Sequence, residues 1–384
     1  MAGKASAARK LFHMSVRIAT FNVENLMRRF DFSGFQQHGD IDRALMLFDI
    51  HDDRQYRELE QARVVALTDD TRQLTALAIA DTHADILCLQ EVDNIDVLKA
   101  FEYGYLFKMV GDGYKQKFLV EGNDSRGIDV AVVMKDVTRD GQKLECVRVT
   151  SHAALTFSEL GLYSSGVAAL GIKDSERIFR RDCLELELLV GGNPLTLFVT
   201  HLKAMGAPHN GLDGRLATLP VRVAEASAIR HIITQKFGAG QTANHNWLLC
   251  GDCNDYIEKV AVLDDGQGGY KFEHTFDDNN ALKILLADGF CESLVARRDV
   301  LDRWTNYHSR GPAERHLCEL DYMFASPKLA RENASAKPDI IRGGQPYRAI
   351  FPAGQNDKRY PRVGWDRPKA SDHCPVAMTF DIKP

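Results

Sequence analysis

The sequence predicts an α/β fold, in which strands and helices are mixed along the chain. Short apolar runs that fit buried strands recur, as at residues 85–92 and 246–252. Residues 71–82 and 220–237 instead carry apolar side chains at helical spacing, with Pro220 suited to a first turn. Turn residues such as Gly191 join other strands directly. Hairpins as well as helical crossovers are therefore expected.

The composition is that of a globular protein without a strong overall charge. Of the 384 residues, 45% are hydrophobic and 26% are charged, and the formal net charge is -5. These values argue against a generally basic surface for nucleic acid but allow a local basic groove. Residues 1–15 are basic and lack the apolar run of a signal peptide, so we expect a flexible tail before a single domain at 16–384. No apolar run is long enough for a membrane helix, so no stable membrane association is expected.

Eight cysteines are scattered along the chain without the spacing of a zinc site or of a secreted disulfide scaffold. This usage favours a reducing, cytoplasmic location. Cys250 and Cys253 are separated by two residues, as in redox motifs. Buried, reduced thiols beside a catalytic aspartate are the preferred interpretation, because no thioredoxin-like context accompanies the pair.

The first predicted strand, 16–21, delivers Asn22 and Glu24 at its end. A long charged and aromatic insertion at about 28–70 follows, which we interpret as a functional rim or lid; a surface insertion without a role is the alternative. The next apolar strand ends at Glu91. A carboxylate at the exit of a buried strand is costly unless it is paired or binds a cation, so Glu91 is a candidate site residue.

Further candidates lie in the middle of the chain. Residues 182–188 and 195–201 form a predicted hairpin that delivers His201 and Lys203 at its exit. A lone histidine there is more often structural than catalytic, so His201 gains weight only from its neighbours. Arg126 lies in a turn between two other predicted strands.

The strand at 246–252 ends in Gly251 and Asp252, and Asn254 follows two residues later. A glycine at this point would let the backbone come close to a ligand. Two polar residues separated by one position can point into one pocket, so Asp252 and Asn254 are a candidate pair.

The C-terminal part of the chain supplies the last candidates. Asp321 is an inward acid on the strand predicted at 319–325. Asp372 and His373 stand beside each other before Pro375 and an alternating apolar run. This order places a carboxylate and an imidazole at the mouth of a buried strand.

Six short motifs contain these candidates and follow one another along the chain. They are Thr20-Phe21-Asn22-Val23-Glu24, Leu89-Gln90-Glu91-Val92, Thr200-His201-Leu202-Lys203, Gly251-Asp252-Cys253-Asn254-Asp255, Leu320-Asp321-Tyr322 and Ser371-Asp372-His373-Cys374-Pro375-Val376. Together they resemble the ordered motifs of the endonuclease/exonuclease/phosphatase superfamily, which includes DNase I-like nucleases, inositol polyphosphate 5-phosphatases and bacterial sphingomyelinases. The resemblance spans nearly the whole chain and is nearest to bacterial members of the nuclease type.

The resemblance implies a four-layer α/β sandwich, with two central mixed β-sheets flanked by helices and the site at one end. It also implies a role for each candidate. Asp252 and Asn254 would position the attacking water and the phosphate, and His373 would act as general base or phosphate contact. The implied metal ligands are Asn22, Glu24, Glu91 and Asp372; the implied catalytic residues are His201, Asp252, Asn254, Asp321 and His373; and the implied substrate contacts are Arg126 and Lys203.

The chemistry of these residue types agrees with metal-assisted hydrolysis of a phosphate ester. Carboxylate and amide oxygens prefer Mg²⁺ or Mn²⁺ to the soft metals that thiolates select, so no zinc is expected. A hard cation and histidines together can supply a deprotonated water and compensate the charge that grows on the phosphoryl oxygens.

The substrate is expected to be nucleic acid, DNA or RNA, cleaved by a nuclease. Arg28, Arg29, Arg43 and Arg54 on the insertion could meet a phosphate backbone, although the acidic net charge speaks against this. The alternative is a phosphatase or phosphodiesterase of a small phosphorylated metabolite or a lipid headgroup. A binding protein that keeps the scaffold without catalysis is a third alternative, which the intact site residues disfavour. No obligate protein partner is evident.

Overall fold

The computed structural model describes residues 15–26, 69–206, 212–355 and 358–384. The expected tail at 1–15, apart from Ser15, lies outside these residues. So does nearly all of the expected insertion at 28–70, with its four arginines. Both expectations, and that of a single domain, stay predictions.

A first six-stranded sheet contains both ends of the described chain. Its strand order is β15-β16-β1-β2-β4-β3. Strands β1 and β2 are parallel, and the other neighbours are antiparallel. The strands are β1 (Ser15–Leu26), β2 (Ile86–Val92), β3 (Gln116–Leu119), β4 (Asp129–Met134), β15 (Asp339–Ile340) and β16 (Val376–Asp381).

A second six-stranded sheet has the order β11-β14-β8-β7-β6-β5. Here β7 and β8 are the parallel pair, so both sheets are mixed as expected. The strands are β5 (Leu144–Ser151), β6 (Cys183–Val190), β7 (Asn193–His201), β8 (Trp247–Asp252), β11 (Glu292–Ser293) and β14 (Asp321–Ala325).

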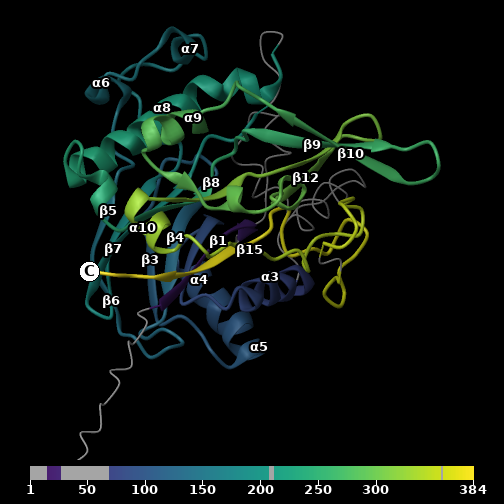
Figure 1. Cartoon of the computed structure of the whole chain (residues 1–384), viewed down its shortest axis with the longest axis horizontal. Coiled ribbons are helices and arrows are strands. Elements are labelled where there is room, and N and C mark those ends of the chain that lie inside the picture. The colour runs from purple at the N-terminus through teal and green to yellow at the C-terminus, as the bar shows by residue number, and fades with distance from the viewer. Residues whose placement is uncertain (1–14, 27–68, 207–211, 356–357) are drawn as a thin grey trace, which may run out of the picture.

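The two sheets pack face to face, and helices cover their outer faces (Figure 1). The core between them combines side chains of the first sheet, such as Ile18 and Val132, with side chains of the second, such as Leu197 and Leu248. The outer face of the first sheet packs against α3 (Asp69–Thr82) and α4 (Ile95–Phe101), and that of the second against α8 (Gly214–Phe237) and α9 (Leu282–Leu286). This arrangement is the expected four-layer sandwich.

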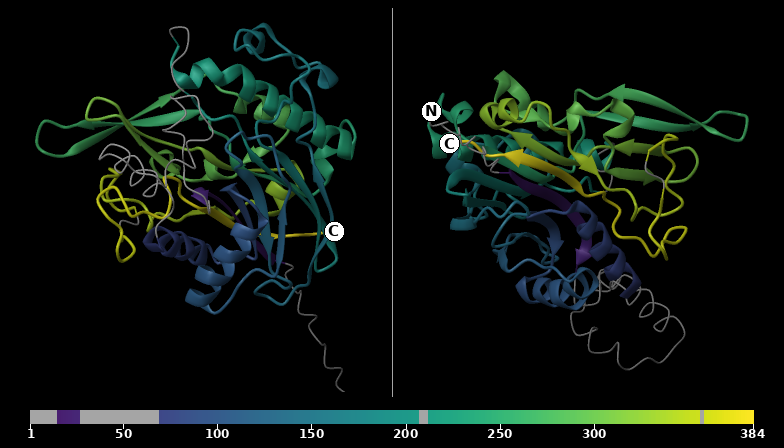
Figure 2. Two further views of the ribbon diagram at one scale, coloured as in Figure 1. Left: turned by 180° about the vertical axis from the view of Figure 1, so that it is seen from behind. Right: turned by 60° about the horizontal axis from the view of Figure 1, so that its bottom comes forward.

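The sequence did not predict a third sheet, which extends away from the sandwich (Figure 2). Its four strands have the order β10-β9-β13-β12 and are antiparallel. Strands β12 and β13 are only four residues long, and β9 and β10 alternate in a pattern that does not show which sheet a strand joins. They are β9 (Glu258–Asp264), β10 (Tyr270–Phe276), β12 (Asn306–Ser309) and β13 (Arg315–Cys318).

Short helical segments connect these elements. Most of them are single turns whose apolar positions are too few to show a period. They are η2 (Glu102–Phe107), α5 (Lys108–Val110), α6 (Phe157–Leu160), α7 (Ser165–Ala168), η3 (Thr242–Asn244), η4 (Ala287–Gly289), η5 (Val295–Arg297), η6 (Val300–Asp302) and α10 (Pro327–Glu332).

Helix α8 begins earlier than the sequence indicated. The expected first turn at Pro220 was wrong, because Asp213 caps the helix and accepts a hydrogen bond from the backbone N–H of Leu216 at 2.9 Å. Pro220 therefore lies inside the helix. The first turns carry Arg215 and Arg222, whose polar heads masked the helical pattern.

The cysteines agree with the reduced interpretation. All eight are free thiols in the structure, and Cys250 and Cys253 point into different cores, one between the sheets and one beneath α8. Burial raises the pKa of both thiols well above the usual value. The two side chains therefore do not form a redox pair. Among the described residues, no helix is long and apolar enough to cross a membrane.

Candidate active site

The site lies where the parallel pair of each sheet ends. In the first sheet, Asn22 on β1 pairs with Gln90 on β2, directly before Glu91. In the second, Asp252 on β8 lies between His201 on β7 and Asp321 on β14. Since the two sheets face each other, residues from five strands meet at one end of the sandwich.

Asn22 joins the two sheets. Its Nδ2 donates to Oδ2 of Asp252 at 3.0 Å and lies 3.3 Å from Oε1 of Glu91. Asn22 is 1% exposed, so both contacts are shielded from water. The amide oxygen accepts from the backbone N–H of Glu24 at 3.0 Å, which fixes the orientation of the side chain.

Asp252 lies at the centre of this group of site residues. Besides Asn22, its Oδ2 lies 3.1 Å from Nδ2 of Asn254, 3.4 Å from Nε2 of His201 and 3.7 Å from Nε2 of His373. Burial raises the pKa of Asp252 to about 7, against the opposing attraction of His373. A carboxyl group with this pKa can exchange a proton near neutral pH.

His373 is held by Asp321. Its Nδ1 lies 2.7 Å from Oδ2 of Asp321, and both side chains are buried. Burial alone would lower the pKa of His373, but the carboxylates of Asp321 and Asp252 overcome this and raise it well above the usual value. The geometry therefore favours an imidazolium whose Nε2–H is directed toward the centre of the site.

His201 has the opposite electrostatic character. Burial lowers its pKa far below the usual value, and the positive charges of Arg181 and His373 act in the same direction. Its Nε2 faces Asp252 and lies 3.9 Å from Oε1 of Glu91. The site thus contains one neutral and one charged imidazole, and each can present a hydrogen-bond donor.

Glu91 and Asp372 are the acids best placed to hold a cation. Burial raises the pKa of Glu91, and the neighbouring charge of Asp372 raises it further. Two buried acids that repel each other fit a hard divalent ion with oxygen ligands, and the amide of Asn22 lies beside them. Within the described residues, no cluster of three or more His, Cys, Asp or Glu has the arrangement of a ready metal site. The donor set is thus two carboxylates and an amide.

Glu24 has partners that the sequence did not suggest. Its Oε1 lies 2.7 Å from Nη2 of Arg367, and its Oε2 lies 3.0 Å from Nζ of Lys369. Burial and the charge of Asp372 nevertheless raise its pKa. Both cations come from the segment just before Asp372.

Arg126 and Lys203 lie at the edge of this group of site residues. The guanidinium of Arg126 contacts Asp124, with Nε 3.1 Å from its Oδ1, and its charge acts on both Glu91 and His201. The Nζ of Lys203 donates to a backbone carbonyl at 3.1 Å. All eleven expected site residues lie around this end of the sandwich, although Arg126 and Lys203 point toward partners of their own.

The backbone of the site is held in unusual conformations. Glu24, Asn25, Glu91 and Asn254 all have positive φ angles, between 47° and 68°. For non-glycine residues this conformation is uncommon and is maintained only when the surroundings enforce it. At Glu91 the ladder between β2 and β4 shifts register, so a bulge turns this side chain toward the site.

Gly251 is required for strand packing, and not for the close approach of a ligand that the sequence suggested. A Cβ atom there would lie 1.9 Å from the carbonyl oxygen of Thr200, and φ is +148°. The glycine therefore lets β8 approach β7 closely, instead of making room for a ligand.

Two buried acids hold the segments next to the site in place, and the sequence did not predict this role for them. Glu225 on α8 accepts the backbone N–H groups of Lys203 at 2.7 Å and Arg180 at 3.0 Å. Asp255 pairs with Arg215 at 2.7 Å and with Arg222 at 3.3 Å. Acids and arginines on one helix usually face solvent, so the helical pattern gave no signal of these contacts.

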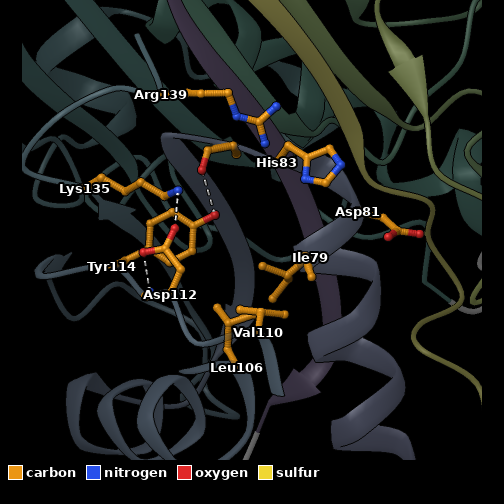
Figure 3. Close-up of a pocket in the computed structure, with 12 residues that line it drawn as sticks. Ile79, Asp81, His83, Leu106, Val110, Asp112, Tyr114, Lys135 and Arg139 are labelled. Carbon is orange, nitrogen blue, oxygen red and sulfur yellow. Dashed lines mark hydrogen bonds and ion pairs between the residues drawn. The ribbon is translucent and has the colours of Figure 1, made fainter. Parts of the chain in front are cut away.

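A separate cavity of about 310 Å³ lies at the other end of the first sheet (Figure 3). The Nζ of Lys135 reaches Oδ2 of Asp112 at 2.6 Å, and the hydroxyl of Tyr114 donates to the carbonyl of Ala84 at 3.1 Å. No expected site residue lines this cavity. The sheet end with the converging acids and imidazoles, and not this hollow, is the candidate active site.

Several solved structures are similar to this chain. The human Nocturnin catalytic domain with bound sulfate is 16% identical, with 97% of this chain and 96% of that chain covered and a TM-score of 0.50. SmcL is 16% identical, with coverages of 96% and 99% and a TM-score of 0.50. A Bacteroides thetaiotaomicron protein of the endonuclease/exonuclease/phosphatase family is 12% identical, with coverages of 96% and 98% and a TM-score of 0.49. A comparison with curated proteins gave no match.

The first two likenesses show the fold alone and confirm the expected DNase I-like sandwich. The family follows from a direct match, because the model of the Endonuclease/Exonuclease/phosphatase family matches residues 19–373, from β1 to His373. This chain belongs to the endonuclease/exonuclease/phosphatase family, whose members hydrolyse phosphate esters.

Proposed function

We propose that this protein is a divalent-metal-dependent phosphodiesterase and that it cleaves nucleic acid, DNA or RNA. The convergence of four polar side chains within 3.0–3.7 Å of one carboxylate oxygen of Asp252 carries this proposal. These groups include an amide, a neutral imidazole and an imidazolium. Such a set can orient a water molecule and compensate the negative charge of a phosphate in the transition state.

Asn22, Glu91 and Asp372 would hold Mg²⁺ or Mn²⁺, with Glu24 as the fourth expected ligand. When bound there, the ion would polarise the phosphate and lower the pKa of water. Burial and the charge of Asp372 raise the pKa of Glu91, so the anion of Glu91 is disfavoured unless a cation is near. The pKa of Asp372 is lowered despite its burial, because Lys369 and His373 stabilise its anion. Oxygen donors and the lack of a thiolate beside them favour a hard ion.

The roles of the other residues follow from their charges. Asp252, whose pKa is about 7, accepts a proton from the attacking water, and Asn254 keeps this carboxylate in place through two hydrogen bonds. His373 donates from Nε2 to a phosphoryl oxygen, while Asp321 fixes its ring. Neutral His201 donates from Nε2 to a second oxygen.

The surroundings of the site favour an anionic substrate. Arg126 and Arg367 are about half exposed at its rim, with exposed fractions of 50% and 41% for their side chains. The tip of the β9–β10 hairpin, residues 265–269, is polar and rich in glycine. A lipid surface is therefore a poorer fit, because a tip of this kind has no apolar side chains to insert.

A substrate panel with matched variants tests the proposal. Single- and double-stranded DNA, RNA, inositol phosphates, mannose 6-phosphate and sphingomyelin are each incubated with Mg²⁺, Mn²⁺ or a chelator. We expect cleavage of a polynucleotide that requires metal and falls by roughly 10²–10⁴-fold in Asp252→Asn and His373→Ala. The control Asp136→Asn removes an exposed acid at the far end of the sheet and keeps the wild-type rate. Faster hydrolysis of a small phosphomonoester would overturn the nuclease assignment.

A further inference from the structure

The third sheet presents two chemically different faces. Side chains of neighbouring strands that lie opposite each other share a face, and successive residues alternate between faces. Val260, Val262 and Leu317 point into the main core. His316 and its neighbours across the ladder, His308 and Ala261, therefore point the other way. We call this second side the outer face.

The outer face is continuous with the active site. Cys318 shares it with His316 and lies opposite Asn306 on β12. Asn306 forms a bridge with His373, and its Nδ2 donates to the carbonyl of Asp372 at 3.1 Å. From Cys318 to His316 is two residues, or about 7 Å along a strand. Successive phosphates in a polynucleotide have roughly this separation. A nucleotide adjacent to the one at the active site would therefore lie on the outer face.

Aromatic rings form a series on the outer face. The guanidinium of Arg215 lies 4.0 Å from the ring centre of Tyr256, and this ring meets His316 at 6.1 Å. The rings of His316 and His308 follow at a centroid distance of 4.8 Å and an angle of 31°. Tyr256 is buried, whereas the side chain of His308 is 34% exposed. The ring of His308 is thus accessible to solvent at the outer end of the series, above a buried Tyr256 whose ring meets His316 edge-on at an angle of 61°.

The charges around these rings are mixed. Burial lowers the pKa of His316 to about 3, and the charges of His308, Lys259, Arg215 and Arg310 act in the same direction. Arg215 is paired with Asp255 and Asp277, Glu314 lies near His308 at 3.3 Å and near Arg310 at 3.8 Å, and Glu273 on β10 lies opposite Ala261 of the outer face. No ion pair of Lys259 is present among the described residues, so this lysine is a cation of the face that can meet an anion.

We propose that the outer face, with Lys259, His308, Arg310 and His316, binds the segment of single-stranded nucleic acid that flanks the scissile phosphate. The proposal rests on the proposed function and deepens it by naming the polymer's form. Cationic side chains that follow a backbone, with rings on which unpaired bases stack, are the features that bind single strands without sequence preference. Bases inside a duplex are already stacked on one another and could not use these rings.

Binding in the presence of a chelator tests the face without cleavage. Fluorescence anisotropy measures the affinity of the full chain for labelled oligo(dT) and oligo(rU) of about 12 nucleotides. The half-buried Lys259 and the exposed Arg310 are replaced together in Lys259→Ala/Arg310→Ala, and the outer ring is replaced in His308→Ala. We expect each change to weaken binding roughly tenfold. The double variant should also lower the salt slope of the logarithm of affinity by about 1.4, the value for two lost phosphate contacts on a single strand.

The matched control is Lys115→Ala/Lys143→Ala. It removes two lysines that are 78% and 70% exposed at the far end of the sandwich, so it changes the net charge equally. We expect it to bind as the wild type does. Equal weakening in this control, or wild-type affinity in the outer-face variants, would overturn the proposal. An equal loss of affinity for a duplex would refute the single-strand assignment.

A cleavage assay separates this proposal from the proposed function. For oligonucleotides, kcat/KM should fall about tenfold more in the outer-face variants than it does for bis(p-nitrophenyl) phosphate. If the wild-type chain binds oligonucleotides through this face but hydrolyses none, the nuclease function fails and the binding surface stands. If it hydrolyses them equally well in all variants, the surface fails and the function stands.

Discussion

Nδ1 of His373 lies 2.7 Å from Oδ2 of Asp321, and the two side chains are only 7% and 0% exposed. Asp321 itself is placed by β14, where it is opposite Asp252 on β8. The imidazole is therefore fixed by one carboxylate and faces another. Asp321 therefore determines both the orientation and the charge of His373, and one substitution at Asp321 tests both.

Replacing Asp321 should affect catalysis through His373. We expect Asp321→Asn to lower kcat for a phosphodiester by roughly 10²–10⁴-fold, because the ring loses its orientation and its positive charge. Asp321 raises the pKa of His373, so the alkaline limb of the pH–rate profile should move to lower pH in the variant. Steady-state kinetics between pH 5 and 9 measure both effects. A profile of unchanged shape would mean that Asp321 has only a structural role.

The metal assignment predicts unequal effects for two acids. Among the described residues, no Lys or Arg forms an ion pair with Glu91, whereas Glu24 already lies between Arg367 and Lys369. We expect Glu91→Gln to raise the Kd for Mn²⁺ roughly tenfold or more and Glu24→Gln to raise it less. Isothermal titration calorimetry or the EPR signal of free Mn²⁺ reports this without any substrate. The reverse order would identify Glu24 as the stronger ligand.

The sequence was most informative about polar site residues that lie in a predicted strand or directly beside one. Asn22, Glu91 and Asp252 each lie in or at the end of an apolar strand, and His373 precedes one, so the strand pattern located them. Their convergence could not be deduced in this way, because it depends on which strands become neighbours across two sheets. The order of the motifs supplied this information through the family resemblance.

The sequence could not predict contacts between polar side chains that are far apart along the chain. Nothing in the spacing of Glu24 and Lys369, which are separated by most of the chain, shows that they lie 3.0 Å apart. The third sheet was missed although its two longer strands alternate, with Val260 and Val262 in one and Phe272 and Phe276 in the other. Such a pattern indicates a strand but does not show which sheet the strand joins.

Asp255 should be far more important for stability than an exposed acid in a similar pair. It is fully buried and pairs with Arg215 and Arg222, so Asp255→Ala leaves two buried guanidinium groups with less compensation. We expect a loss of about 3–5 kcal/mol in the free energy of unfolding. Asp339→Ala is the control, because Asp339 pairs with Arg17 but its side chain is 62% exposed, and its loss should be below about 1 kcal/mol. Urea denaturation followed by circular dichroism measures both, and similar losses would contradict the prediction.

His316 should make the folded state sensitive to acid. Its pKa is lowered to about 3 by burial, with further contributions from His308, Lys259, Arg215 and Arg310, whereas the unfolded chain has the ordinary value of 6.5. A depressed histidine pKa means that the unfolded chain binds the proton first, so this contribution to stability is complete above pH 6.5 and falls as the pH drops toward 3. At pH 5.5 the loss from one such histidine is about 1 kcal/mol.

Urea denaturation at pH 7.5 and 5.5 measures this effect. In His316→Gln the decrease in stability between the two pH values should be smaller than in the wild type by about 1 kcal/mol. The exposed His231 on α8 provides the control, since His231→Gln should keep the wild-type dependence. Equal decreases in all three proteins would show that His316 takes up a proton in the folded state. The outer face would then carry an imidazolium at this position instead of the neutral ring on which an unpaired base can stack.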